Sequence, residues 1–503
     1  MIRTVAQARV VNPVERRRDL VAVGAIAGAV LAVHLALSGR YGFHRDELYH
    51  LAAGRHPALG YVDHPPLVPL LGRAVAALAG EHLWPLRAAA GAVHAVLVLL
   101  AAGIARELGG VRRAPVLAAL ATATMPLLLA TGSLFQTVVF DQLWWAVVLL
   151  LVVRLLNGAD ARWWLAVGAA FGFGLETKWT IALLGIGLAI GVAAVPEARR
   201  HLRSPWLWAG CAVALLLWLP NLVWLALDDW QSLDFIGNSN QQVRAEDGRL
   251  GFVLAQIALI GPLALPLVGA GVAWLWRSRR WRVLAVAVAT VAAVLLVAGG
   301  KAYYLGPLYV LGAAAGSVAV EGWLAAEPQR WRLAVGALAA NGLVALGAVV
   351  PVAPAGVYAD LFHDVNGELG EEVGWPEMVD LVAAVVEVLP ADEQADVRVI
   401  AASYGEAAAI DLYGPARGLP RGTALSAHNA YAAWWPDGEP AGTFVTVRYP
   451  RRAIEPYCDA VGPVAVVETI DGVANEMAGT PVLVCRDLRV TPDELRDGLR
   501  HLE

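Results

Sequence analysis

Residues 137–156 of this chain read TVVFDQLWWAVVLLLVVRLL, and this run decides the fold class. A helix needs about 20 predominantly apolar residues to cross the hydrocarbon core of a bilayer. The run has that length, and its only charged residues are Asp141 near its start and Arg154 near its end. It therefore predicts a transmembrane helix rather than a helix of a soluble core.

Comparable apolar runs recur along the chain, near residues 19–38, 86–104, 114–130, 162–175, 179–196, 205–226, 251–276, 283–299, 302–322 and 332–351. Together they predict a mainly α-helical, polytopic bundle of about eleven spans. The runs 162–175 and 179–196 are short, so they are either two spans joined by a tight turn or one broken hairpin. The first run follows Arg16-Arg17-Arg18 without a convincing cleavage site. We therefore expect a first transmembrane helix there rather than a cleaved signal peptide.

The composition agrees with a membrane protein. Of the 503 residues, 58% are hydrophobic and 16% are charged, and the mean hydropathy is +0.57. Soluble domains carry about 25% charged residues. No basic run suited to nucleic acid is present, and the net charge of −5 says little because the distribution of charge matters more in a membrane protein.

The arginines give the expected orientation. With the ends of the runs assigned alternately from an inside start, one side receives these residues: Arg16-Arg17-Arg18, Arg106, Arg112, Arg113, Arg154, Arg162, Arg199, Arg200, Arg203, Arg277, Arg279, Arg280, Arg282, Arg330 and Arg332. The other side receives segments 39–85, 131–136, 176–178, 227–250, 300–301 and the tail. Because loops rich in lysine and arginine remain in the cytoplasm, we expect a multi-pass cell-membrane protein with a cytoplasmic N-terminus and an extracytoplasmic tail.

Two domains are expected, a membrane domain over 1–351 and an extracytoplasmic α/β domain over 352–503. The tail has a helical pattern at 376–389 and β-rich runs at 397–400, 443–447 and 482–484. Cys458 and Cys485 lie in this tail, where a disulfide is one of two open alternatives. Cys211, in an apolar stretch, is expected to be a small core residue.

The first outer loop, 39–85, carries much of the polar chemistry. It contains Arg45, Asp46, Glu47, Tyr49 and His50, followed by Asp63-His64-Pro65-Pro66-Leu67. Segment 65–80 is amphipathic and predicts a helix at the membrane interface. Two adjacent carboxylates beside an arginine suit acid/base chemistry because neighbouring charges shift their pKa values, although a solvated loop with charged side chains is the simpler alternative.

Three further polar segments face the same side. Asp141 near the outer end of a span marks either a functional site or a carboxylate favoured by the helix dipole. Lys178 and Lys301 lie at outer helix ends, where they either act on a ligand or snorkel to the interface. Trp179, Tyr303 and Tyr304 are alternatively interfacial aromatics. Because cations and carboxylates from five segments collect on one face, we expect chemistry on a lipid-linked phosphate ester.

These residues resemble the GT-C superfamily of membrane glycosyltransferases, in particular the protein O-mannosyltransferases and the lipid A aminoarabinose transferases. The resemblance covers about residues 20–350. Asp46-Glu47-Leu48-Tyr49 is similar to the family's acidic pair, and Asp63-His64-Pro65-Pro66-Leu67 is similar to its second loop motif, with His64 in place of the usual lysine. Arg87, Asp141, Leu175-Glu176-Thr177-Lys178 and Lys301-Ala302-Tyr303-Tyr304 match later motifs in order.

The resemblance implies inverting transfer of a sugar from a polyprenyl-phosphate donor to an acceptor hydroxyl on a protein, lipid or cell-wall glycan. It implies Asp46 as general base, with Glu47 and Asp141 as further catalytic residues that orient the base, acceptor or donor. It implies a substrate-binding set of Arg45, Tyr49, Asp63, His64, Arg87, Lys178, Lys301, Tyr303 and Tyr304. No metal is required in principle, because the lipid phosphate is already a good leaving group. A divalent metal at Asp63-His64 stays an alternative, although these two residues lack the three or four ligands of a usual site.

Other functions stay open. A transporter or flippase would place charges near the bilayer midplane, often within repeats with broken helices. A non-catalytic envelope binding protein would use the tail as its binding module. The tail segments Ser403-Tyr404-Gly405-Glu406 and Ser426-Ala427-His428-Asn429 resemble those of related bacterial proteins with an added outer domain. Loop 227–250, with Asp228-Asp229-Trp230, is expected to help set the sugar specificity.

Overall fold

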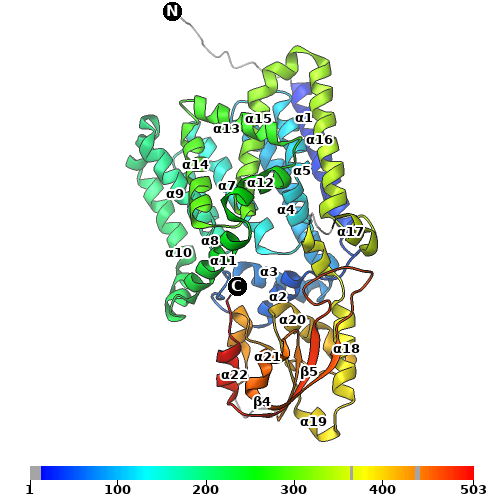
Figure 1. Cartoon of the computed structure of the whole chain (residues 1–503). Helices are drawn as coiled ribbons and strands as arrows, with labels where there is room; N and C mark the ends of the chain where they lie inside the picture. The colour runs from blue at the N-terminus through cyan, green and yellow to red at the C-terminus, as the bar shows by residue number, and fades with distance from the viewer. Residues whose placement is uncertain (1–12, 363–365, 437–441, 503) are drawn as a thin grey trace, which may run out of the picture.

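The computed structural model describes residues 13–362, 366–436 and 442–502. It is a helical bundle with a small sheet region at one end (Figure 1). The bundle contains α1 (Pro13–Leu37), α4 (Leu83–Glu107), α5 (Ala114–Thr124), α6 (Pro126–Gly132), α7 (Thr137–Leu156), α8 (Trp163–Leu175), α9 (Ile181–Ala194), α10 (Pro205–Leu227), α12 (Gly248–Ile260), α13 (Leu265–Arg277), α14 (Arg282–Ala298), α15 (Gly306–Ala326) and α16 (Pro328–Val349). The helical membrane bundle expected from the apolar runs is therefore confirmed. Residues 1–12, with the predicted cytoplasmic N-terminus, lie outside the described residues.

Six helices of the described chain are long and apolar enough to cross a membrane, and three bent pairs raise the number to nine. The apolar helices α8 and α14 are shorter than that criterion. Each predicted run contains a helix or a bent pair, and α8 and α9 are separate helices joined by residues 176–180. The structure thus supports between six and nine spans by length and composition, against the predicted eleven.

Two predicted runs are not straight. The axes of α5 and α6 differ by 65°, and those of α12 and α13 differ by 110°. Met125 is extended (φ −72°, ψ 129°) because the ring of the following Pro126 disfavours helical geometry before it. Gly261 has φ +84° and ψ 137°, a conformation that glycine adopts readily because it has no Cβ, and α12 ends there.

The arginine-rich ends of the helices gather at the end of the bundle far from the sheet (Figure 1). Arg154 pairs with Glu107 at 2.9 Å, and Arg113 donates to the Leu324 carbonyl at 2.8 Å. Arg280 donates to the Leu156 carbonyl at 3.1 Å. These contacts bring the ends of α4, α5, α7, α14 and α15 together, as the alternating assignment requires.

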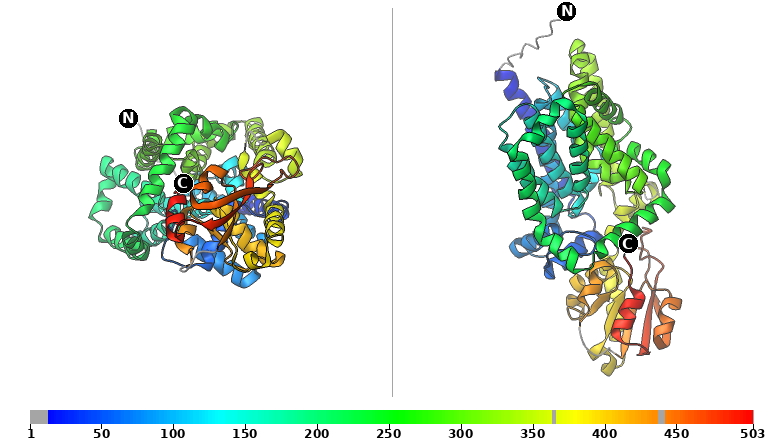
Figure 2. Two further views of the ribbon diagram at one scale, coloured as in Figure 1. Left: turned by 60° about the horizontal axis from the view of Figure 1, so that its bottom comes forward. Right: turned by 90° about the vertical axis from the view of Figure 1, so that its left-hand side faces the viewer.

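The first outer loop folds into α2 (Arg45–Arg55) and α3 (Leu67–Ala79), which lie between the bundle and the sheet (Figures 1 and 2). The helix predicted over 65–80 is therefore present, and it begins directly after Pro65-Pro66. The N-terminus of α2 is fixed by a capping box. His44 accepts from the Asp46 amide at 3.2 Å, and Glu47 accepts from the His44 amide at 2.9 Å.

The tail forms a five-stranded mixed sheet in the order β2-β1-β3-β5-β4. Its strands are β1 (Arg398–Ala401), β2 (Ala424–Ser426), β3 (Thr443–Val447), β4 (Cys458–Val466) and β5 (Pro481–Leu488). β1 is parallel to β2 and β3, whereas β5 is antiparallel to β3 and β4. The three predicted strands match β1, β3 and β5, so an α/β region is present; β2 and β4 were not predicted.

The tail begins with α17 (Ala355–Phe362), which lies beside the bundle (Figure 1), and η3 (Gly367–Glu372). The helices of the sheet region are α18 (Trp375–Glu387), α19 (Ala391–Asp396), α20 (Tyr404–Tyr413), η4 (Gly414–Arg417), η5 (Asn429–Trp434), α21 (Arg451–Ile454), η6 (Glu455–Tyr457) and α22 (Pro492–Leu499). The apolar core of this region is continuous with the first loop. Leu48 and Tyr49 of α2 share one buried cluster with Trp375, Val399 and Val445. Packing therefore fixes the sheet region against α2.

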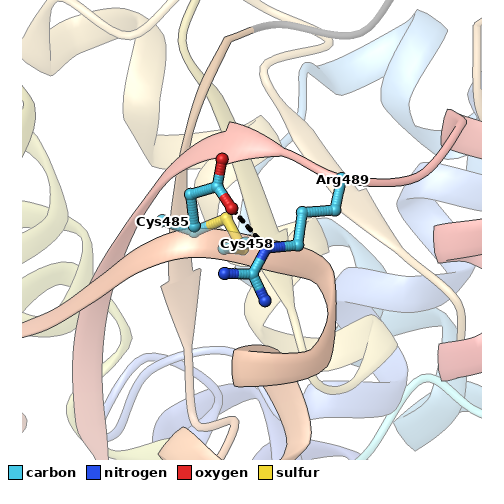
Figure 3. The surroundings of a disulfide bond; sticks show 4 residues. Cys458, Cys485 and Arg489 are labelled. Atoms are coloured by element: carbon cyan, nitrogen blue, oxygen red, sulfur yellow. Dashed lines mark hydrogen bonds and ion pairs between the residues drawn. A yellow bond between two sulfur atoms is a disulfide. The ribbon is translucent and has the colours of Figure 1, made fainter.

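Two of the three cysteines form a disulfide, and the third is free. Cys458 and Cys485 form a disulfide between β4 and β5, with 5.8 Å between their Cα atoms, beside the Asp459–Arg489 ion pair (Figure 3). Cys211 is exposed on α10, so its prediction as a core residue is wrong. In a membrane helix, lipid covers apolar side chains that no protein contacts, so an apolar run does not by itself predict burial.

Candidate functional site

A cavity of about 410 Å³ lies where the first loop, the bundle and the tail meet. This volume is within the range of small-molecule sites. Its polar lining includes Asp46, Tyr49, His50, Asp63, His64, Thr137, Lys178, Thr180, Ser239, Asn240, Lys301, Tyr303, Tyr304, Tyr404 and Asn429. Its apolar lining comes mainly from Leu183 of α9, Phe235 and Ile236 of α11 (Gln231–Glu246), and Val294, Leu295 and Ala298 of α14.

Asp46 is the first carboxylate of the cavity. It lies in the first turn of α2, and the Tyr404 hydroxyl donates to its Oδ1 at 2.9 Å. Burial opposes ionisation of this carboxyl, but the charges of His44, Arg45 and His50, with the Tyr404 hydrogen bond, hold its pKa well below the usual range. Asp46 is therefore an anion throughout the physiological pH range.

Asp63 is the second carboxylate. The Tyr49 hydroxyl donates to its Oδ1 at 2.9 Å, and the Asn429 side-chain amide donates to its Oδ2 at 3.2 Å. His64 Nε2 lies 3.8 Å from Oδ1. Burial raises the pKa of Asp63, although His64 and the Tyr49 hydrogen bond lower it in part. The two carboxylates of one cavity thus have pKa values displaced in opposite directions, an arrangement typical of acid/base sites.

Two lysines line the same cavity. Lys178 donates to Thr137 Oγ1 at 3.2 Å, and its Nζ lies 5.1 Å from the centre of the Tyr304 ring and 5.9 Å from that of Tyr303. Lys301 directly precedes η2 (Ala302–Leu305), which carries both tyrosines. Within the described ranges, neither ammonium group has a carboxylate at ion-pair distance. Both lysines can therefore accept an anionic ligand without breaking an internal ion pair.

Glu47 and Arg87 do not line the cavity. They form a buried ion pair, with 2.8 Å between Arg87 Nη2 and Glu47 Oε2, and Glu372 Oε2 lies 3.1 Å from the same nitrogen. Glu47 also accepts from the Phe135 amide at 3.0 Å. Consecutive helical residues point in directions about 100° apart, so Asp46 faces the cavity while Glu47 holds α2 to α4.

Asp141 and Arg45 also lie behind the cavity wall. Asp141 accepts from Trp145 Nε1 and from Thr180 Oγ1, both at 2.9 Å, and Thr180 in turn lines the cavity. Arg45 pairs with Glu476 and lies 3.7 Å from Glu368. Of the twelve predicted site residues, the structure therefore brings eight to the cavity: Asp46, Tyr49, Asp63, His64, Lys178, Lys301, Tyr303 and Tyr304.

Several lining residues were absent from the predicted site. His50 follows Asp46 by four positions and so shares its helix face, which is a signal that the sequence contained. Phe235, Ile236, Ser239 and Asn240 lie on α11, inside the predicted specificity loop 227–250, which is a helix. Tyr404 and Asn429 belong to the two tail segments that had no predicted role.

No group of three or more His, Cys, Asp or Glu side chains that could hold a metal ion occurs in the described part of the chain. The ionisable and hydrogen-bonding groups that line the cavity include carboxylates, imidazoles, phenols and ammonium groups.

Comparison with known proteins agrees with this architecture. Residues 63–224 match the family model described as dolichyl-phosphate-mannose-protein mannosyltransferase. The fold is similar to that of ArnT from Cupriavidus metallidurans in the apo state, with TM-score 0.58 and 16% identity over 95% of this chain and 98% of that chain. The undecaprenyl phosphate-bound structure of the same protein gives TM-score 0.59 and 16% identity, over 96% and 99% of the two chains. No curated protein matches the sequence. The predicted resemblance to GT-C membrane glycosyltransferases is confirmed.

Proposed function

We propose that this protein is a membrane glycosyltransferase that transfers one sugar from a polyprenyl-phosphate donor to an acceptor hydroxyl. The observation that carries the proposal is the single cavity in which Asp46 and Asp63 meet Lys178 and Lys301. Acceptor activation needs a carboxylate, and departure of a lipid phosphate needs cations. The similar ArnT structure is bound to undecaprenyl phosphate, which supports a polyprenyl phosphate as the donor's lipid portion.

The proposed step is a direct displacement. The acceptor oxygen attacks the anomeric carbon, and its proton passes to the Asp46 carboxylate. The bond between the anomeric carbon and the phosphate oxygen breaks, and that oxygen leaves with its electron pair on the polyprenyl monophosphate. Lys178 and Lys301 stabilise the growing negative charge. Because one displacement occurs without a covalent sugar–enzyme intermediate, the anomeric configuration inverts.

The pH dependence of kcat/KM distinguishes Asp46 from Asp63 as the general base. A general base must be deprotonated, so the rate falls below its pKa. Burial alone would raise the pKa of Asp46, but the charges of His44, Arg45 and His50 outweigh it, so this pKa is lowered. Burial raises the pKa of Asp63. With Asp46 as base, the acid limb of kcat/KM lies below about pH 4, the usual value for an aspartate; with Asp63 as base, it lies above that value.

We further propose that the sheet region and the cavity are extracytoplasmic. The Cys458–Cys485 disulfide favours an oxidising compartment. The arginine-rich ends lie at the far end of the bundle, which favours a cytoplasmic location for that end. Tagging of the tail and protease accessibility in intact cells test this orientation.

The proposal is tested with purified protein, a panel of synthetic radiolabelled polyprenyl-phosphate sugars and an envelope acceptor fraction, with and without EDTA. We expect transfer in both conditions, loss of transfer in Asp46→Asn, and retention in the control Asp380→Asn. Asp380 is an exposed α18 carboxylate paired with Arg417, so it reports the same chemical change away from the cavity. Absence of transfer by folded wild-type protein from every donor would overturn the proposal and favour a transporter or binding protein.

A further inference from the structure

The tail contacts the cavity through two short segments of the sheet region. Tyr404 follows Ser403 at the start of α20, and Asn429 follows His428 at the start of η5. Each lies just beyond the end of a neighbouring parallel strand, because β1 ends at Ala401 and β2 ends at Ser426. The carboxyl ends of parallel strands share one edge of a sheet, so the topology presents both side chains together.

Tyr404 contacts the first loop in two ways. Its hydroxyl donates to Asp46 Oδ1 at 2.9 Å, and its ring stacks on the Tyr49 ring with 4.3 Å between their centres. A capping box fixes its backbone, because Ser403 accepts from the Gly405 amide while Glu406 accepts from the Ser403 amide at 2.8 Å. The phenol is therefore held by a defined helix start rather than by a free loop.

The segment that begins at Asn429 binds Asp63, the second carboxylate of the cavity. The Asn429 side-chain amide donates to Asp63 Oδ2 at 3.2 Å, and the Ala430 backbone amide donates to the Tyr49 hydroxyl at 3.2 Å. Tyr49 in turn donates to Asp63 Oδ1 at 2.9 Å. Asn429 has φ +48°, a left-handed conformation that asparagine and aspartate tolerate better than other residues with a Cβ.

We propose that the tail completes the reaction site, with Tyr404 and Asn429 as positioning residues that orient Asp46 and Asp63. This inference rests on the proposed transferase function and assigns a role to the sheet region within it. A hydrogen bond from Tyr404 to one carboxylate oxygen leaves the other oxygen to accept the acceptor proton. It also stabilises the ionised carboxylate, so that the base remains deprotonated.

Several other groups act on Asp46, and the effect of Tyr404 must be separated from theirs. On α2 and its N-cap these are His44, Arg45 and His50. Four residues of other elements also interact electrostatically with Asp46: Asp63, Lys178, Tyr303 and Glu368. Tyr404→Phe leaves all of these groups in place and removes one hydroxyl, so a change in the pH profile reports that hydroxyl.

The experiment compares wild type with Tyr404→Phe across pH, using the sugar-transfer assay. Loss of one hydrogen bond to a charged group is expected to lower kcat about tenfold or more and to move the acid limb upward by about one pH unit. The donor KM is expected to change little, because the phenol acts through Asp46. The matched control is Tyr431→Phe, which removes a hydroxyl that donates to Asp411 at 3.2 Å outside the cavity lining.

A second variant tests the other contact. Asn429→Asp keeps the shape and the left-handed backbone but places a carboxylate against Asp63, so activity near neutral pH is expected to fall and to recover in part at lower pH. If wild type transfers sugar while Tyr404→Phe and Asn429→Asp keep wild-type kcat and pH profiles, this inference is overturned and the proposed function stands. If folded wild type transfers no sugar, both are overturned.

Discussion

Arg87 is the centre of a buried charge cluster whose disruption has a calculable effect on stability. Arg87 is 1% exposed, Glu47 is 0% exposed and Glu372 is 1% exposed. Arg87 joins these two carboxylates and also donates to the carbonyls of Ser38 and Gly42, at 3.3 Å and 2.9 Å. It therefore ties α4 to the first loop and to η3 of the tail.

Replacing Arg87 by methionine keeps much of the aliphatic volume and removes the charge. Removing one partner of a buried ion pair costs about 3–5 kcal/mol, because the other charge stays buried without compensation. With an unfolding entropy of about 1 kcal/mol/K for a chain of this length, we expect the unfolding midpoint of Arg87→Met in detergent to fall by about 3–5 °C. Adding Glu372→Gln is expected to recover part of the loss, since it removes one of the two unpaired carboxylates.

The assay is thermal unfolding of purified variants followed by circular dichroism, at one detergent concentration and pH. The matched control is Arg417→Met, which removes the same charge from an exposed pair with Asp380 and is expected to cost about 0–1 kcal/mol. If Arg87→Met unfolds within about 1 °C of wild type, this cluster does not stabilise the junction of the loop, the bundle and the tail.

Three further predictions concern charge and covalent structure. Lys178→Met is expected to lower kcat about 10²–10³-fold, by removing one donor to the leaving phosphate; steady-state kinetics with unchanged kcat would contradict this. Burial raises the pKa of Glu372 to about 7 despite the opposing charge of Arg87. Its stabilising contribution is therefore full below about pH 4.3 and is lost as pH rises through about 7, so wild type should lose stability relative to Glu372→Gln over that window. Reduction of Cys458–Cys485, which encloses a separation of 27 residues, should cost about 3.5 kcal/mol; a Cys458→Ser, Cys485→Ser variant that unfolds at the wild-type temperature would argue against that.

The sequence predicted the helices because hydropathy along a spanning run is a one-dimensional signal. The predicted limits of 137–156 coincide with α7. The breaks were missed because they depend on single residues, Pro126 after Met125 and Gly261 at the end of α12. Both residues are visible in the sequence as breakers, but apolar residues continue on either side and hide them in a window of spanning length.

The site was predicted in part because the order of the spans along the chain shows which polar residues lie on the same side of the membrane. Counting spans placed Asp46, Asp63, Lys178 and Lys301 on one side, and the structure brings them to one cavity. Counting could not separate Asp46 from its neighbour Glu47, because helix geometry decides which of the two faces the cavity. Contacts between distant parts of the chain could not be predicted either. Tyr404 donates a hydrogen bond to Asp46, which lies 358 positions earlier, and no local sequence pattern indicates such a contact.

Asp46 is the proposed general base of the sugar-transfer reaction. Its most direct test is the initial rate of transfer from a polyprenyl-phosphate sugar by Asp46→Asn, relative to wild type and to Asp380→Asn. We expect a fall of about 10²–10⁴-fold, with cooperative thermal unfolding retained in the variant and full activity in the control. Transfer by Asp46→Asn at the wild-type rate would contradict it.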